Sequence, residues 1–471
     1  MKKIYILIFL ITGYLLGTSQ ETITLDAKRI TPEEVGIYDT DLLPPSFHKN
    51  RREALRKLMP DKSVAVFFAG PVRNRSNDVD YEFHQDPNFY YLTGLRESHA
   101  VLVVYKEEQL IDGVKTKEVL FLQERNPKGE KWNGRKLGTE GAKQLLLLDH
   151  VLPSKSFKKV DLLLDSLEQI FYVSDREDVR NDMGANDLYD LIQAFNQKIA
   201  GKKNQTRKKY KLNTWMAQLR QDKLDEELEL MRKAIDITCM AQIELMQNLK
   251  PDMTEYQTEA LVEFRFKYEG AEYTGFPSIH GSGENSCILH YTDSRRPFTK
   301  NDLLVSDIGA EYHGYTADVT RTLPVNGKYS KEQKAIYNLV FKAQEAGIQA
   351  CKPGAGFWDA HGVATDIIGK GLVELGIIKE EKEVRKYFLH GTSHYLGLDV
   401  HDMGDYKPLK AGQVITVEPG IYIPEGSECD EKWWNIGVRI EDDILITEDG
   451  RENLSDCVPR TIEEIKAIMV K

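Results

Sequence analysis

The chain has 471 residues and a formal net charge of −11, from 63 Lys and Arg against 74 Asp and Glu. It is too long for one ordinary domain, so we expect two or three. The excess of acid argues against a nucleic-acid partner, because nucleic-acid binding requires a basic face that offsets phosphate charge. The five cysteines are odd in number and widely spaced, which excludes a small disulfide-rich domain and leaves any pairing open.

The N-terminus has the pattern of an export signal. Lys2 and Lys3 precede an apolar, uncharged stretch that is short for a membrane span and ends in small residues. We predict a signal peptide over residues 1–20 and an exported mature chain, periplasmic or secreted, with no membrane partner. An uncleaved anchor is the alternative. Loss of the two lysines changes the net charge from −11 to −13.

The next part of the chain has the pattern of an α/β domain, predicted over residues 43–200. The spacing of Phe47, Leu55 and Leu58 predicts a helix over 46–59. Further helices are expected at 138–148 and 187–198. β-Branched and aromatic residues predict strands at 63–69, 89–92, 100–105 and 119–123. Strands that alternate with helices favour a compact α/β fold.

A basic segment, residues 201–212, follows this domain. Its sequence GKKNQTRKKYKL contains six Lys and Arg and no acid. We interpret it as a solvated linker or hairpin, because the excess of acid in the chain argues against a nucleic-acid site.

Residues 213–471 mix helices and strands, which is typical of an α+β domain. A long helical pattern covers 214–249. Capping boxes at Ser330–Gln333 and Thr461–Glu464 predict the starts of two further helices, over 335–350 and at the C-terminus. Strands are predicted at 303–308, 318–323, 413–417 and 436–447.

Two aspartates lie in or beside apolar strand-like runs, where an unpaired carboxylate is costly: Asp307 and Asp318. The segment between them contains glycines that suit a tight turn, so the two strands could pair antiparallel and direct both carboxylates to one point. The alternative is a pair of separate carboxylates bound by backbone groups or by Arg321.

Seven of the eleven histidines lie between residues 280 and 401, and three of them share one short segment: His390, His394 and His401. Glycines within this segment favour a loop over a helix. A single histidine here would most often be an ordinary hydrogen-bonded side chain. Three within twelve residues favour metal binding or acid–base chemistry.

Two glutamates also lie within or at the end of predicted strands. Glu418 follows a β-branched run and precedes a Pro-Gly pair, so capping of that turn is its simplest role. Glu441 lies two residues after Arg439 in an apolar strand, and alternation places both on one face, where a plain ion pair is the alternative to a functional role.

Taken together, four carboxylates and one histidine beside buried strands require offsetting positive charge. Two divalent ions balance the charge, and a pair of metals bridged by carboxylates and hydroxide is a known hydrolytic arrangement. The oxygen-rich ligands favour Mn²⁺, with Zn²⁺ or Co²⁺ possible, although affinity order alone favours zinc. The motifs HExxH, GxSxG and the P-loop are absent from the sequence, which gives no support to a zincin, an α/β-hydrolase or an NTPase.

The order of these motifs resembles the pita-bread metallopeptidases, and among them most closely the Xaa-Pro aminopeptidases (aminopeptidase P). The resemblance covers about residues 43–470, including the N-terminal α/β domain. It is carried by PVRNRSNDVDYEFHQDPNFYYLTGLRES, HYT, SDIG, TADVTRT, HGTSHYLGLDVHD, VEPGIY and VRIEDD. The fold implied is an N-terminal α/β domain followed by an α+β pita-bread catalytic domain.

The resemblance implies five metal ligands: Asp307, Asp318, His394, Glu418 and Glu441. Asp318 and Glu441 would bridge two ions, and a bridging water or hydroxide would attack the bond that precedes proline. Glu418 would also accept the proton of the attacking water. The implied substrate is a peptide with proline in the second position, and a homodimer or homotetramer is expected.

Further roles follow from the same resemblance. His290 and His401 would hold the substrate and stabilise developing negative charge. His390 would line the proline pocket, and Arg439 with Tyr422 would orient a ligand carboxylate. Outside this set, we expect His280 and His361 to be surface or locally hydrogen-bonded residues and His313 to be exposed in a turn. Trp433 and Trp434 could close over the substrate or simply pack.

Two other functions remain open. A Xaa-Pro dipeptidase has the same metal ligands, although the segment FYYLTG favours the aminopeptidase. A non-catalytic peptide-binding relative would lack metal ligands, whereas all five are present here.

Overall fold

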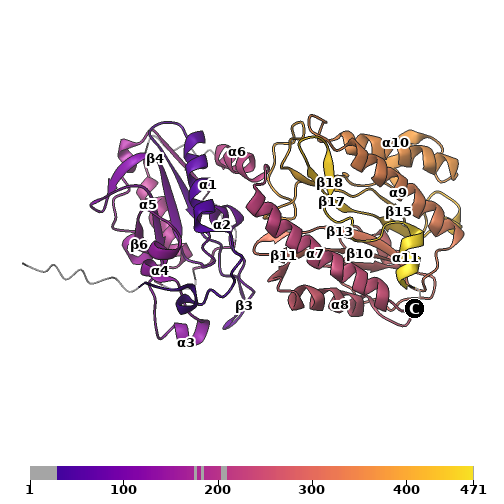
Figure 1. The fold of residues 1–471 in the computed structure, drawn as a ribbon, viewed down its shortest axis with the longest axis horizontal. Coiled ribbons are helices and arrows are strands. Elements are labelled where there is room, and N and C mark those ends of the chain that lie inside the picture. Colours follow the sequence, from indigo (N-terminus) through magenta and orange to yellow (C-terminus); the bar gives the residue numbers. More distant parts are fainter. Residues whose placement is uncertain (1–28, 174–177, 182–184, 203–208, 470–471) are drawn as a thin grey trace, which may run out of the picture.

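The computed structural model describes residues 29–173, 178–181, 185–202 and 209–469. The predicted signal peptide and residues 203–208 of the basic segment lie outside the described residues. Figure 1 shows two domains side by side, connected through helices α6 (Lys209–Arg220) and α7 (Asp225–Asn248). Within the described part of the chain, no helix is long and apolar enough to cross a membrane.

The N-terminal domain is built on a five-stranded sheet of order β6-β5-β4-β1-β7. Strand β1 pairs antiparallel with the central strand β4 and parallel with β7, and β5 pairs antiparallel with β4 and parallel with β6. The strands of this domain are β1 (Ser63–Phe68), β2 (Asn74–Ser76), β3 (Val79–Asp80), β4 (Val101–Ile111), β5 (Val114–Leu122), β6 (Val151–Pro153) and β7 (Gln169–Tyr172). The strands predicted at 63–69, 100–105 and 119–123 are confirmed.

Both faces of this sheet are buried. Along β1, Ala65 and Phe67 pack on the side that carries α1 and α2, whereas Val64, Val66 and Phe68 pack with α5 on the other side. The predicted helices at 46–59, 138–148 and 187–198 are confirmed with shifts of a few residues. The helices of this domain are η1 (Pro32–Val35), α1 (Pro45–Leu58), α2 (Pro87–Thr93), α3 (Glu130–Asn133), α4 (Gly138–Leu145), η2 (Ser154–Ser156), η3 (Leu164–Ser166) and α5 (Leu188–Ile199).

The strand predicted at 89–92 is wrong, because this segment belongs to helix α2. The Asp86 side chain caps the helix and accepts a hydrogen bond from the Phe89 amide at 2.8 Å. Pro87 occupies the first turn, and Gly94 ends the helix in the left-handed conformation with φ of 70°. These end signals outweigh the aromatic composition that favoured a strand.

The long helical pattern predicted over 214–249 is interrupted at residues 221–224 and forms α6 and α7. Helix α6 packs on the N-terminal domain, where Trp215 contacts Phe171 with ring centroids 4.6 Å apart. It therefore crosses the predicted boundary at residue 213. At the interruption, the buried side chains of Arg220 and Lys223 form ion pairs with Asp402 at 2.5 and 2.9 Å.

The C-terminal domain contains three three-stranded sheets, of order β13-β10-β9, β12-β11-β8 and β14-β17-β18, and a two-stranded sheet β15-β16. Helix α7 packs against β11, β12 and β13, and α9 packs against β14, β15 and β16. The strands are β8 (Tyr273–Thr274), β9 (Ile279–Ser282), β10 (Leu303–Ile308), β11 (Ala310–Tyr312), β12 (Tyr315–Thr316), β13 (Val319–Pro324), β14 (Val414–Val417), β15 (Gly420–Ile423), β16 (Ile436–Arg439), β17 (Asp442–Ile446) and β18 (Arg451–Asn453). The other helices are α8 (Glu255–Tyr268), η4 (Gly283–Cys287), α9 (Lys331–Ala350), α10 (Asp359–Glu374), η5 (Glu381–Lys386), η6 (Glu431–Trp433) and α11 (Ile462–Met469).

Most predicted elements of this domain are confirmed, including the two capping boxes. Ser330 and Thr461 accept hydrogen bonds from the amides of Gln333 and Glu464, at 3.1 and 3.2 Å. The single strand predicted over 436–447 is wrong, because Ile440 and Glu441 separate β16 from β17. Arg439 and Glu441 therefore do not share the face of one continuous strand.

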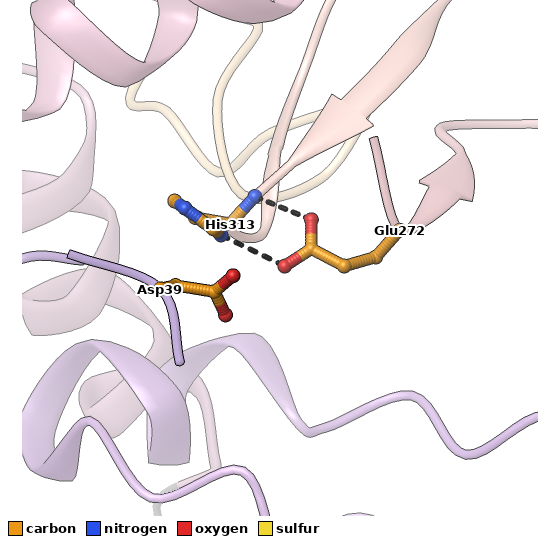
Figure 2. Close-up of side chains that lie close together, drawn as sticks. All are labelled: Asp39, Glu272 and His313. Atoms are coloured by element: carbon orange, nitrogen blue, oxygen red, sulfur yellow. Dashed lines mark hydrogen bonds and ion pairs between the residues drawn. The ribbon is translucent and has the colours of Figure 1, made fainter. Parts of the chain in front are cut away.

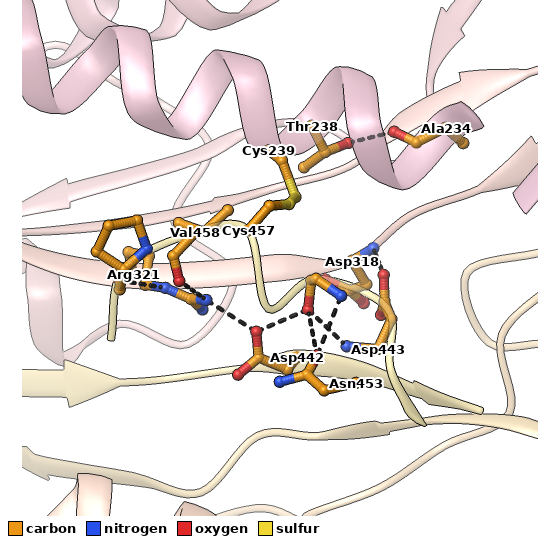
Figure 3. Close-up of a disulfide and its surroundings, with 12 residues drawn as sticks. Ala234, Thr238, Cys239, Asp318, Arg321, Asp442, Asp443, Asn453, Cys457 and Val458 are labelled. Carbon is orange, nitrogen blue, oxygen red and sulfur yellow. Dashed lines mark hydrogen bonds and ion pairs between the residues drawn. A yellow bond between two sulfur atoms is a disulfide. The ribbon is translucent and has the colours of Figure 1, made fainter. Parts of the chain in front are cut away.

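One disulfide connects two parts of the C-terminal domain that are distant in sequence. Cys239 in α7 is bonded to Cys457, which follows β18, and Figure 3 shows the bridge beside Arg321 and Asp442. Cys287, Cys351 and Cys429 are free thiols. The pairing left open by the sequence is therefore one bridge and three free cysteines.

Candidate active site

The five predicted metal ligands come from separate elements and meet at one cavity of about 620 Å³. Asp307 lies in β10, and Asp318 immediately precedes β13. His394 lies in a loop, Glu418 lies between β14 and β15, and Glu441 lies between β16 and β17. Asp307, Asp318 and Glu441 are buried, and the other two side chains are partly buried.

The pairing of β10 with β13 explains how the two aspartates meet. Asp307 lies directly opposite Thr320 in the antiparallel register. Because side chains two residues apart share a face, Asp318 and Thr320 lie on the same side as Asp307. Gln242 of α7 donates hydrogen bonds to the carbonyl oxygens of Ser306 and Val319, at 3.0 and 2.9 Å. These bonds connect α7 to both β10 and β13 and stabilise their pairing.

The segment between the two strands is more than the tight turn suggested by its glycines. It contains β11 and β12, which belong to a second sheet with β8. The predicted antiparallel pairing of the two aspartate-bearing strands is nevertheless confirmed.

The His394 imidazole is oriented toward the carboxylates by its own loop. The Thr416 amide donates to the His394 carbonyl at 3.0 Å, which holds this loop along β14. Nδ1 lies 3.1 Å from the Tyr395 carbonyl oxygen, so this nitrogen carries the proton. Nε2 is then free to accept, and it lies 3.4 Å from Asp318 and 3.8 Å from Glu418.

Glu441 reaches the cavity because the strand is interrupted there. Its amide donates to the Thr320 carbonyl at 3.1 Å, and its Oε2 accepts a hydrogen bond from the Thr320 hydroxyl at 2.6 Å. Ligand atoms of Asp318, His394 and Glu441 lie within 4.8 Å of one another, a spacing that suits a shared metal ion.

Arg439 pairs with Asp307 and not with Glu441. Its Nη2 lies 2.6 Å from Asp307 Oδ2, and its Nη1 donates to the Tyr422 hydroxyl oxygen at 2.8 Å. The Tyr422 oxygen also lies 2.8 Å from His390 Nε2. A continuous hydrogen-bonded chain therefore connects Asp307, Arg439, Tyr422 and His390, and it fixes the orientation of the Asp307 carboxylate.

The cavity concentrates negative charge. Burial, reinforced by the neighbouring carboxylates, raises the pKa values of Asp318 and Glu441 well above their usual range. Burial also raises the pKa of Glu418 to about 7. Asp307 Oδ1 is buried without a hydrogen-bond partner among the described residues. Carboxylates that lack compensating protein charge fit a site for divalent cations.

Three further histidines line this cavity: His290, His390 and His401. Burial and the neighbouring Arg439 lower the pKa of His390 to about 4. Burial and the adjacent His394 and His290 lower the pKa of His401, whose ring centroid lies 4.4 Å from that of His394. His390 and His401 are therefore neutral near pH 7 and able to donate one hydrogen bond each.

Two of the remaining histidine predictions are wrong. His280 is neither exposed nor locally hydrogen-bonded: it is buried in β9, and neither ring nitrogen has a partner among the described residues. Burial lowers its pKa to about 3, so it is neutral. His313 is buried as well, although it occupies the turn between β11 and β12. His361 is hydrogen-bonded, but its partner is not local in sequence: Nδ1 lies 3.0 Å from the hydroxyl of Thr392, 31 residues away.

The burial of His313 is explained by a cluster of charges between the two domains. Figure 2 shows its amide and ring bound to Glu272, with Asp39 close by. Its Nε2 lies 2.9 Å from Asp41. The spacing of Asp39, Glu272 and His313 would suit a metal. However, Arg96 already pairs with Asp39 and Glu272 at 3.2 and 2.7 Å, so a protein cation offsets these carboxylates.

Packing is the role that the structure shows for the two adjacent tryptophans. Trp433 is buried, and Trp434 donates from its indole nitrogen to the Ser427 carbonyl at 3.1 Å. Neither is among the described residues that line the cavity. The tryptophan that does line it is Trp358, which the sequence patterns do not indicate because it lies in a loop with no polar motif.

Comparison with protein families divides the chain into two matched regions. Residues 48–171 match the aminopeptidase P N-terminal domain, and residues 229–448 match metallopeptidase family M24. These regions coincide with the two domains of the structure.

Individual relatives are similar to this chain over nearly its whole length. The Xaa-Pro aminopeptidase of Escherichia coli is 37% identical over 90% of this chain and 97% of its own length. The structure of Pseudomonas aeruginosa aminopeptidase PepP has a TM-score of 0.81 and 34% identity, over 91% of this chain and 98% of that chain. Aminopeptidase P from Escherichia coli with the inhibitor Pro-Leu has a TM-score of 0.80 and 36% identity, over 91% and 99%. The chain therefore belongs to metallopeptidase family M24 and has the aminopeptidase P architecture, an N-terminal α/β domain followed by a pita-bread catalytic domain.

Proposed function

We propose that this metallopeptidase is a dinuclear Xaa-Pro aminopeptidase, which releases the first residue of peptides whose second residue is proline. The observation that carries the proposal is the convergence of five side chains on one cavity: Asp307, Asp318, His394, Glu418 and Glu441. Relatives similar over most of their length have the same activity in their names.

Two divalent ions fit the residues present. Four carboxylates face the cavity, whereas among its described lining residues Arg439 is the one with permanent positive charge. Among these carboxylates, Asp307 has a buried Oδ1 without a hydrogen-bond partner among the described residues, and the free Nε2 of His394 adds a nitrogen ligand. The oxygen-rich set favours Mn²⁺, with Zn²⁺ or Co²⁺ as alternatives. When bound, such ions polarise a carbonyl and lower the pKa of water.

The chain's own residues would perform the positioning and proton transfer. Glu418 would accept the proton of the attacking water, because its carboxylate lies at the cavity surface and within 3.4 Å of His390 Nδ1. His290 and His401 would hold the substrate carbonyls, since an imidazole N–H stabilises negative charge that develops on oxygen. Arg439 would keep Asp307 in place through its 2.6 Å contact.

The bond to be cleaved is a tertiary amide, because proline lacks the backbone N–H. We propose that His390 lines the pocket for the proline ring. The complex of the Escherichia coli enzyme with the inhibitor Pro-Leu supports a site that accepts proline followed by an apolar residue.

Peptide hydrolysis tests this function directly. The purified enzyme would be incubated with Ala-Pro-Gly, Ala-Gly-Gly and the dipeptide Ala-Pro, with EDTA or with added Mn²⁺, Zn²⁺ or Co²⁺, and products would be identified by mass. We expect release of alanine from Ala-Pro-Gly alone, with the highest rate in Mn²⁺. Cleavage of Ala-Pro alone would identify a dipeptidase, and metal-free protein that cleaves nothing would identify a binding protein.

We also propose that the mature enzyme is exported and forms a dimer or tetramer. The N-terminal pattern of lysines and apolar residues supports export, and a disulfide between Cys239 and Cys457 is typical of oxidising compartments. Cell fractionation with N-terminal sequencing of the mature chain tests export. Light scattering of the purified enzyme gives its oligomeric state.

A further inference from the structure

Trp358 is an exposed aromatic residue at the edge of the catalytic cavity. Its side chain is 54% exposed, yet it lines the cavity together with His390 and Gly391. A large apolar ring that faces solvent beside a peptidase centre is suited to contact a ligand, because covering it removes apolar surface from water.

The indole is held in place by other aromatic rings. It lies parallel to Tyr406, with a centroid distance of 5.9 Å and an angle of 7° between planes. Phe357 contacts both rings edge-on, at 5.1 and 4.8 Å, and is itself packed against Tyr395 at 4.9 Å. Phe357 and Tyr395 are buried. Because the stack is already formed, little side-chain freedom is lost when a ligand binds to it.

Trp358 lies on the side of the cavity that contains His390. A Cβ atom added to Gly391 would lie 3.8 Å from the indole Cζ3, which places the ring beside the backbone that directly follows His390. Trp358 also lines a second, open groove of about 690 Å³, which lies at the start of α10 and includes Pro353, Gly354 and Val363. The indole is therefore shared by the catalytic cavity and the groove outside it.

The position of the indole has a consequence for a bound peptide. With the proline ring beside His390, a chain that continues toward the outer groove passes Trp358 with its next residue. A pocket of about 210 Å³ also adjoins the catalytic cavity at Val400 and His401, and its lining includes the carboxylates of Glu311 and Asp399. These carboxylates form ion pairs with His84 and Arg220. An apolar third side chain is better accommodated on the indole than beside these ion-paired groups, whose solvation it would reduce.

We propose that Trp358 binds the side chain of the third substrate residue and selects apolar or aromatic residues at that position. This inference rests on the proposed aminopeptidase function and adds a specificity determinant to it. Contact with the indole lowers the free energy of the bound peptide equally before and during the reaction, so it acts on KM and leaves kcat unchanged.

Steady-state kinetics of the Mn²⁺-loaded enzyme with Ala-Pro-Phe, Ala-Pro-Leu and Ala-Pro-Gly test this proposal. Trp358→Ala should lower kcat/KM for Ala-Pro-Phe by roughly five- to tenfold through KM, while the value for Ala-Pro-Gly stays within about twofold. Trp358→Phe should restore most of the preference. Trp132→Ala is the matched control, since Trp132 is 88% exposed in α3 of the N-terminal domain and should leave all three substrates unaffected.

Equal loss for all three peptides, or no loss for any, would overturn the role of Trp358. If the wild-type enzyme cleaves none of them, the proposed function fails. Calorimetric binding of Pro-Phe and Pro-Gly to the metal-loaded enzyme then tests the third-residue site separately. Tighter binding of Pro-Phe that disappears in Trp358→Ala supports the third-residue site. Equal binding of the two dipeptides contradicts it.

Discussion

Arg439 Nη2 lies 2.6 Å from Asp307 Oδ2, although 132 residues separate the two in sequence, and neither side chain is more than 10% exposed. The same guanidinium contacts the hydroxyl oxygens of Tyr422 and Thr320, at 2.8 and 3.2 Å. Asp307 is thus oriented by a side chain that is itself held at two other points. Such outer contacts fix the geometry of a metal ligand.

We therefore expect Arg439→Lys to lower kcat/KM or metal affinity by about 10- to 100-fold, because lysine cannot supply the guanidinium fork. Peptide hydrolysis and metal content by mass spectrometry measure both quantities. Arg232→Lys is the matched control, since Arg232 forms an exposed pair with Glu452 at 2.6 Å. Equal behaviour of the two variants would contradict the positioning role of Arg439.

Glu418→Gln should lower turnover by about 10²- to 10⁴-fold, because the amide cannot accept a proton. Asp307→Ala should abolish activity by removing a carboxylate from the metal site. Circular dichroism would show that both variants are folded, and metal content would separate loss of metal from loss of the base. Full activity in either folded variant would refute the assignment of that residue.

His401→Ala should lower kcat strongly while two metal ions per chain are retained, since His401 lines the cavity and we propose that it holds the substrate and does not bind metal. His361→Ala is a useful comparison, because His361 is hydrogen-bonded to Thr392 and should affect turnover far less. Loss of metal from the His401 variant would show that its role is ligation.

The charge cluster around His313 should make stability depend on pH. Burial opposes protonation of His313, but the hydrogen bonds that its ring donates to the carboxylates of Glu272 and Asp41 outweigh burial and raise the pKa of His313 above 6.5. Since the folded pKa exceeds the unfolded one, this stabilisation is complete below about pH 6.5 and is lost as pH rises through the folded value. Asp39, Arg96 and Tyr312 also face this cluster.

The measurement is the apparent Tm at pH 6 and pH 9 for the wild type and His313→Gln. We expect the variant to be destabilised more at pH 6 than at pH 9. An equal difference at both values would show that His313 acts through packing alone.

The Cys239–Cys457 bridge should stabilise the region behind the metal site. Cys457 precedes Val458, whose carbonyl accepts from Arg321 at 2.9 Å, and Arg321 also donates to the Glu441 carbonyl at 2.7 Å. Cys457→Ser should lower the free energy of unfolding by about 2–5 kcal/mol. Cys429→Ser removes a half-buried free thiol and is the control. Unchanged denaturant midpoints in Cys457→Ser would contradict this role.

Local patterns in the sequence predicted much of the fold. The capping boxes at Ser330 and Thr461 and the apolar run that forms β10 depend on neighbouring residues alone, and all three are confirmed. The carboxylates within apolar runs were recognisable for the same reason, because burial of an unpaired charge is costly wherever the chain folds. The structure then brings Asp307, Asp318 and Glu441 to one cavity.

Predictions failed where a local pattern was ambiguous, or where the residues that contact a side chain are distant from it in sequence. Residues 89–92 have strand-like composition, but the Asp86 cap and Gly94 form α2. The position of His313 in a glycine-containing turn predicted an exposed side chain. It is buried because Asp41 and Glu272, from distant parts of the sequence, form hydrogen bonds with its ring.

The sequence by itself determined the chemical class of the site, since the types and order of the carboxylates and histidines specify an oxygen-rich metal centre. Only the tertiary structure decided which groups support that centre: Arg439 beside Asp307, the Cys239–Cys457 bridge, and the aromatic stack under Trp358. The reason is physical. Residue types are local information, whereas contacts across more than a hundred residues exist only once the chain has packed.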